Sequence, residues 1–174
     1  APPTTSRVSV NLEAPTVGHL QAIAPDKDLR GELLRPLQKA AELCGQGRAR
    51  SGLTTQFVVG GAGESDQHIL HSSDWLYRHC RLRRAYYSSF RPVAGTPLSD
   101  VPASPPAREL RLYQADALLT DYGFGVQELP FAENGRLPVG VDPKTAAALA
   151  HPERYPVEVN TATREELLRV PGLG

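Results

Sequence analysis

A run of β-branched and aromatic residues that ends in closely spaced glycines constrains the fold of this chain more than any other feature. Residues 54–59 (Thr-Thr-Gln-Phe-Val-Val) suit a strand that is buried on both faces. Three glycines follow within residues 60–63, where they permit positive φ angles and close backbone approach. Ser65 and Asp66 are good N-caps for a following helix. The stretch predicts a strand, a tight turn and a helix, with backbone N–H groups and a helix dipole directed at one spot.

The flanking segments place this stretch within an alternation of strands and helices. The patterns predict strands at 7–12 and 85–90, and helices at 16–23, from 26 or 27 to 44, and at 65–79. Pro36 should kink or split the second of these helices. Strand–helix–strand–helix–strand order is typical of a parallel sheet with right-handed crossovers, built from units of the size found in a (β/α) barrel. Three such units would leave an open sheet edge.

The pattern changes after residue 98. A Pro/Ser-rich connection at 99–106 precedes an amphipathic helix at 107–122, and a short alanine-rich helix begins at Asp142-Pro143. Near the C-terminus, Thr163 and Glu166 have the spacing of a capping box. We therefore divide the chain into residues 1–98 (βα units), 99–155 (linker and helical extension) and 156–174 (C-terminal motif).

Composition excludes little. Lys+Arg and Asp+Glu both number 19, so net charge gives no sign of nucleic-acid binding. The two cysteines do not form a disulfide framework, and no signal peptide or membrane-spanning run is present, so we expect a cytoplasmic protein without membrane contact. The sequence contains no methionine, which leads us to expect a piece of a longer protein.

By itself the glycine turn could serve a nucleotide, a phosphorylated sugar or no ligand. Three segments together resemble the strand ends of radical S-adenosylmethionine (SAM) enzymes: Val59–Asp66 (VGGAGESD), Phe90–Leu98 (FRPVAGTPL) and Val8–Glu13 (VSVNLE). Their order and spacing are similar to those of strands four to six of that barrel. Four segments further resemble the DNA modification and repair branch of the superfamily: Gln56–Asp66, Tyr86–Val93, Arg111–Asp116 and Val157–Gly174.

The resemblance implies an enzyme with a partial TIM barrel that cleaves SAM at a 4Fe–4S cluster, yielding a 5′-deoxyadenosyl radical that abstracts hydrogen from substrate. The protein would supply placement and exclusion of water. The resemblance assigns no catalytic residue. The residues that it places beside the cofactor are Asn11, Glu13, Gly60, Gly61, Gly63, Tyr87 and Ser89. For Glu64 we expect a simpler role, favouring the helix N-terminus through its dipole.

The cluster-binding motif of the family, Cys-x-x-x-Cys-x-x-Cys, does not occur in this sequence. Cys44 and Cys80 lie 36 residues apart, each on a predicted helix, whereas a cluster needs closely placed thiolates. The resemblance therefore implies a missing N-terminal half that binds the cluster upstream of Ala1. We expect no metal site in this chain, and no activity from it alone.

The C-terminal stretch resembles the first helix and hairpin of a helix-hairpin-helix motif. Its turn, Pro171-Gly172-Leu173-Gly174, would present backbone N–H groups to a DNA phosphate without base specificity, with Leu173 directed inward. DNA is therefore the expected partner. Two alternatives remain open: a non-catalytic DNA-binding module, and a radical SAM enzyme acting on tRNA or a small-molecule precursor, in which the hairpin is only structural.

Overall fold

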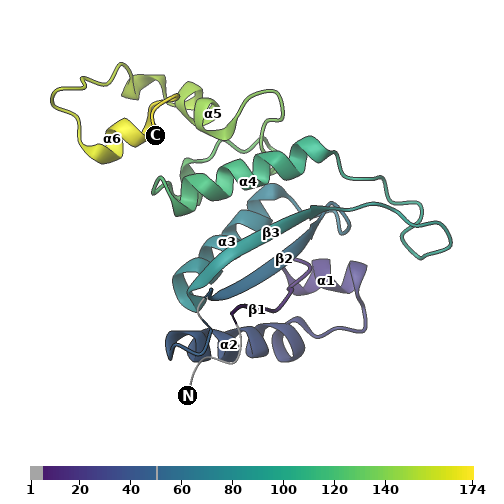
Figure 1. Cartoon of the computed structure of the whole chain (residues 1–174). Helices are drawn as coiled ribbons and strands as arrows, with labels where there is room; N and C mark the ends of the chain where they lie inside the picture. The colour runs from purple at the N-terminus through teal and green to yellow at the C-terminus, as the bar shows by residue number, and fades with distance from the viewer. Residues whose placement is uncertain (1–5, 50) are drawn as a thin grey trace.

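A three-stranded parallel sheet forms the centre of the computed structural model, which describes residues 6–49 and 51–174. The strands lie in chain order: β1 (Val8–Ser9), β2 (Leu53–Val59) and β3 (Leu82–Ser89). Between β1 and β2 the chain forms α1 (Val17–Ile23), a π-helix (Leu29–Leu34) and α2 (Arg35–Gly45). Between β2 and β3 it forms α3 (Asp66–Cys80). The predicted α/β class with a parallel sheet is confirmed (Figure 1).

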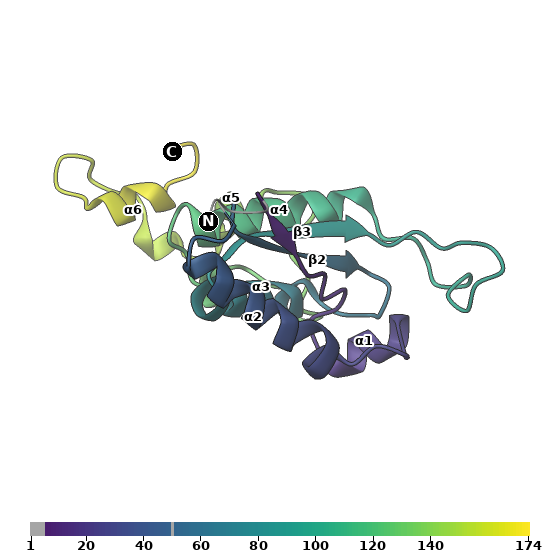
Figure 2. The same ribbon diagram turned by 60° about the horizontal axis from the view of Figure 1, so that its bottom comes forward.

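The remaining helices follow the sheet in sequence. They are α4 (Pro106–Thr120), a 3₁₀ turn (Val126–Glu128), α5 (Pro143–Ala150), a second 3₁₀ turn (Pro152–Arg154) and α6 (Arg164–Arg169). The hydrophobic core continues without a break from Phe57 of β2 through Leu112 of α4 to Leu129, Leu137 and Ala147. Residues 106–147 therefore share one core with the sheet. Figure 2 shows α2 and α3 together beneath the strands.

The first strand is shorter than the predicted span of 7–12, and Thr55 provides the reason. Its hydroxyl donates to the carbonyl of Val10 (2.8 Å) and accepts from the N–H of Leu12 (3.2 Å). A side chain thus replaces the regular ladder there, and only a single bridge at Glu13, which has a φ of 64°, rejoins β2. Near Pro36, where the sequence predicts a kink or split, the helix changes type: the π-helix ends at Leu34 and α2 begins at Arg35, with Pro36 in its first turn.

Side chains alternate across the sheet, which decides which residues each face presents. Phe57 and Tyr87 are buried on the face that packs against the helices, with ring centroids 6.3 Å apart. Tyr86 and Ser88, on either side of Tyr87 along β3, therefore lie on the opposite face, where Ser88 is exposed. In Figure 1 α3 lies behind the strands and this opposite face is turned toward the viewer.

The outer edge of β3 is closed by side chains rather than open. Three successive outward N–H groups donate to groups on α3 and α4: Ala85 to the Tyr77 hydroxyl (3.0 Å), Tyr87 to the Tyr113 hydroxyl (3.0 Å) and Ser89 to Glu109 Oε2 (2.8 Å). The predicted open edge of the sheet is therefore not the β3 edge. A further strand could pair here only by displacing these bonds, which marks β3 as an end strand of the sheet.

Candidate functional site

The glycine turn has the predicted conformation. Gly60 and Gly63 adopt positive φ angles of 93° and 73°, and Ser65 caps α3 by accepting from the N–H of His68 at 3.1 Å. These two glycines follow the carboxyl end of β2, where parallel α/β folds usually hold ligands. The local sequence thus produced the turn and the helix start that it predicted.

Glu64 fills the turn from within, which corrects the expectation that it acts only through the helix dipole. Its side chain is 1% exposed, and its carboxylate accepts from the N–H groups of Gly60 and Ala62, the latter at 3.1 Å. Backbone donors that the sequence directed toward a ligand are therefore bonded to a carboxylate of the same turn. An anionic ligand would have to displace that carboxylate to reach them.

Arg108 of α4 completes a buried ionic network beneath the turn. Its Nε donates to Asp66 Oδ1 at 2.6 Å, and its Nη2 donates to the Glu64 carbonyl at 2.7 Å and lies 3.4 Å from Glu64 Oε1. The second oxygen of Asp66 accepts from the N–H of Leu137 at 2.8 Å. The network joins the turn to α4 and to the segment near residue 137, so it fixes the position of the turn.

Sequence reasoning missed Arg108, although one signal was available. Arg108 lies four residues before Leu112 and seven before Ala115, in the stripe of α4 that is buried. A charged residue at a core position of an amphipathic helix requires a buried counter-charge. The sequence does not identify that counter-charge, because Asp66 lies 42 residues away.

The three glycines of the turn have different surroundings. A Cβ on Gly60 would lie 2.8 Å from the Cβ of Ser104, and one on Gly61 would lie 3.1 Å from Cδ2 of Phe90. A Cβ on Gly63 would meet nothing within 4 Å. Glycine at positions 60 and 61 is thus required by packing within the chain, whereas Gly63 leaves open space beside the turn.

Asn11 and Glu13 lie at the end of β1, beside this turn. The Asn11 amide oxygen accepts from the Ser9 hydroxyl at 3.0 Å, and the Glu13 carboxylate lies 3.4 Å from Lys27 Nζ. The Glu13 carbonyl accepts from Val58 N–H at 2.8 Å, two residues before Gly60. The structure therefore brings Glu13 next to the glycine turn, with its carboxylate directed to a lysine.

Tyr87 lies in the core, on the face of the sheet that packs against the helices. Its side chain is 2% exposed, and its hydroxyl donates to Asp116 Oδ1 at 2.8 Å and lies 3.0 Å from Ser73 Oγ. Tyr77 also donates to both oxygens of Asp116, each at 2.9 Å. Burial raises the pKa of Asp116 against the effect of these hydroxyls, and burial also raises the pKa values of Tyr77 and Tyr87.

Ser89 ends β3 on the same face as Tyr87. Its N–H donates to Glu109, but its Oγ is buried and makes no hydrogen bond within the described residues. The Oγ of Ser104, beside Gly60, is buried and unbonded in the same way. Tyr87 and Ser89 are thus positioned by helix packing, and their assignment to a cofactor stays a prediction.

The C-terminal hairpin follows α6, whose predicted capping box between Thr163 and Glu166 is confirmed. Gly172 and Gly174 have φ angles of 83° and 101°. The N–H of Leu173 donates to Val170 at 3.2 Å, and within residues 6–49 and 51–174 neither glycine N–H has a hydrogen-bond partner. Leu173 is 44% exposed, so the expectation that it points inward is wrong.

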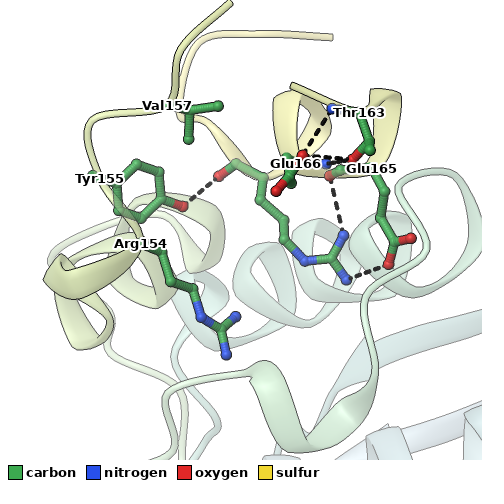
Figure 3. Close-up of a pocket in the computed structure, with 7 residues that line it drawn as sticks. Arg154, Tyr155, Val157, Thr163, Glu165 and Glu166 are labelled. Atoms are coloured by element: carbon green, nitrogen blue, oxygen red, sulfur yellow. Dashed lines mark hydrogen bonds and ion pairs between the residues drawn. The ribbon is translucent and has the colours of Figure 1, made fainter. Parts of the chain in front are cut away.

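Charged groups attach the hairpin helix to the rest of the chain. Arg169 donates through Nε and Nη2 to the two oxygens of Glu128, at 2.9 and 3.0 Å, and its carbonyl accepts from the Tyr155 hydroxyl at 2.9 Å. Burial by itself would raise the pKa of Glu128. Hydrogen bonds from Arg169 and from the N–H of Gly125 outweigh it, so the pKa of Glu128 is lowered. Arg154, Tyr155 and α6 surround a cavity of about 520 Å³ (Figure 3).

The hairpin and the glycine turn lie toward opposite ends of the sheet. Helix α4 runs antiparallel to β3, because Glu109 near its start bonds Ser89 and Asp116 near its end bonds Tyr87. Beyond that end, Tyr122 contacts Gly174, which places the hairpin near the amino ends of the strands (Figure 1). The seven residues of β2 separate these ends by about 23 Å.

The side chains present do not fit a 4Fe–4S cluster. Cys44 lies on α2 and Cys80 on α3, and burial raises the pKa of the Cys80 thiol, which disfavours the thiolate that iron requires. Within the part of the chain that the structure describes, no three His, Cys, Asp or Glu side chains are grouped to hold a metal ion. No helix among these residues is long and apolar enough to cross a membrane.

Comparison with known proteins found no similar family. No protein-family model, no curated protein and no solved structure matches this chain.

Proposed function

We propose that this chain is the DNA-contacting C-terminal part of a radical SAM protein that modifies or repairs DNA. The observation that carries the DNA contact is the exposed hairpin, where the N–H groups of Gly172 and Gly174 have no partner within the described residues. Backbone N–H groups of this kind bind phosphate oxygens without reading sequence. Lys144, whose Nζ donates to the carbonyl of Leu173, adds a positive charge beside the hairpin.

The cofactor assignment is supported by position. The turn at the carboxyl end of β2 and the end of β1 at Glu13 are adjacent, and β3 has the closed edge of an end strand. Open space at Gly63 makes this glycine, with Asn11 and Glu13, the part of the chain best suited to contact SAM. In radical SAM enzymes the cluster supplies the electron that cleaves SAM. The side chains of residues 6–49 and 51–174 do not fit that cluster, so its ligands would have to come from outside these residues.

A second candidate is a DNA-binding module without chemistry of its own. One observation favours it: the separation of about 23 Å between the hairpin and the glycine turn. The sequence encoded upstream of Ala1 distinguishes the candidates. If it contains no Cys-x-x-x-Cys-x-x-Cys, the enzyme assignment fails and the binding module remains.

The DNA contact is tested by titrating fluorescent single- and double-stranded DNA with the 174-residue chain at several salt concentrations. We expect log K to fall linearly with log salt, by about 0.9 for each duplex phosphate that is neutralised. A chain that ends at Val170 should bind more weakly. Gly172→Asp should weaken binding more than Gly172→Asn, because both residues tolerate the positive φ but only Asp repels phosphate. Absence of salt-dependent binding to either DNA would refute the assignment.

A further inference from the structure

A wide hollow lined by arginines lies at the amino ends of the strands. Its volume is about 1420 Å³, and it is bounded by the C-terminal ends of α2, α3 and α4 and by the start of β3. Five arginines and three aspartates contribute to its lining. Because the arginines outnumber the aspartates, this surface carries a local excess of positive charge, although the chain as a whole has no net charge.

Most of the charged groups in the hollow already have partners. Arg78 Nε lies 2.9 Å from Asp74 Oδ1, and Arg7 donates to the Tyr86 hydroxyl. Asp116 accepts from the hydroxyls of Tyr77 and Tyr87. Three guanidinium groups differ, those of Arg81, Arg83 and Arg84. All three residues are exposed, and within residues 6–49 and 51–174 these groups make no hydrogen bond or ion pair. The charge of Arg84 also acts on Asp116, where burial raises the pKa of the carboxyl and this charge partly opposes that larger effect. The N–H donors of all three groups are available to a partner.

Contacts with ring faces and with a glycine hold Arg84 and Arg83 in position without using the N–H donors of their guanidinium groups. The Arg84 guanidinium lies 5.5 Å from the centroid of the Tyr86 ring and 6.0 Å from that of Tyr113, which are cation–π distances. The stem of Arg83 covers Gly52, where a Cβ would lie 3.1 Å from Arg83 Cβ. Ring faces and a glycine thus support both side chains while their donors stay free.

Arg81 occupies a backbone position that normally favours glycine. It ends α3 with φ 48° and ψ 38°, the left-handed conformation in which non-glycine residues are strained by about 1 kcal/mol. Its N–H nevertheless caps the helix by donating to Leu76. An arginine at this position costs stability, and it places a further guanidinium at the rim of the hollow.

We propose that Arg81, Arg83 and Arg84 bind the phosphodiester backbone of a nucleic acid, and that the hollow continues the surface begun by the C-terminal hairpin. The lining includes Asp121, and the next residue, Tyr122, contacts Gly174 of the hairpin. Three separate, solvent-facing guanidinium groups suit a chain of phosphates better than one small anion, because each arginine can engage a different phosphate. The inference rests on the proposed function for the identity of the polyanion as DNA.

The test uses the full chain and the variant Arg81→Gly/Arg83→Ala/Arg84→Ala in the same DNA titration. Loss of three phosphate contacts should weaken binding roughly 100-fold near 0.1 M salt and reduce the salt slope by about 2 to 3, equally for unrelated DNA sequences. Arg81→Gly alone should also weaken binding while leaving the thermal midpoint unchanged or higher, because glycine relieves the left-handed strain. That variant separates lost binding from lost folding.

Arg30→Ala is the matched control, because Arg30 is exposed and lies on the π-helix, outside the lining of the hollow. It should bind DNA as the unmodified chain does. If the triple variant retains full affinity and slope while the chain ending at Val170 loses binding, the hollow is not part of the DNA surface, although the proposed function stands. If the unmodified chain binds no DNA, both proposals fail. Binding to vesicles of anionic phospholipid but not to DNA would overturn the nucleic-acid assignment in favour of a membrane surface.

Discussion

Replacing Arg108 should show how strongly the buried ionic network holds the glycine turn. Arg108→Met preserves most of the side-chain volume but removes the guanidinium that contacts Asp66 and Glu64, whose side chains are each 1% exposed. At 2.6 Å and an effective dielectric of 20, the attraction between Arg108 and Asp66 amounts to roughly 6 kcal/mol, largely offset by desolvation of both ions. The variant leaves two carboxylates buried without their counter-charge, so we expect it to lose about 3–5 kcal/mol of unfolding free energy.

Urea denaturation monitored by circular dichroism measures this loss, and thermal unfolding should show a midpoint lower by about 6–20 °C. Arg111→Met is the control on the same helix, since Arg111 is only partly buried and donates to the carbonyl of Val139. It should lose no more than about 1 kcal/mol. In a double-mutant cycle with Asp66→Asn, the two losses should not add. A loss below 1 kcal/mol for Arg108→Met, or strict additivity with Asp66→Asn, would refute the network as the support of the turn.

Two further predictions concern the edge of the sheet and the attachment of the hairpin. Tyr113→Phe should cost about 1–2 kcal/mol and make the chain associate at high concentration, measured by sedimentation, because it frees the N–H of Tyr87 at the edge of β3; a monomer of unchanged stability would contradict this. Glu128→Gln should destabilise the chain at neutral pH, because the Arg169 pair is lost and the folded-state pKa of Glu128 is lowered. The contribution of Glu128 is complete above the ordinary glutamate pKa and disappears as the pH falls through the lowered value, so the denaturation curves of the two proteins should converge in acid; a constant difference would contradict the pair.

Local patterns in the sequence predicted the elements correctly where neighbouring residues decide the structure. Contacts within a few residues account for four of these features: the strand before Gly60, the N-cap at Ser65, the change of helix type near Pro36 and the capping box at Thr163. The failures arise where a distant side chain intervenes. Thr55 shortens the first strand because its hydroxyl replaces ladder bonds of residues more than 40 positions away.

For this protein the sequence by itself determined the order of strands and helices, the glycine turn and the hairpin, because backbone preferences and hydrophobic periodicity act over short distances. Only the tertiary structure decided what those features contact. It brought Arg108 under the turn and turned Glu64 onto the turn's own N–H groups. It also left the guanidinium groups of Arg81, Arg83 and Arg84 without a hydrogen bond or ion pair among the described residues. Charges pair through space, and no pattern along the chain specifies which side chains will meet once the core has packed.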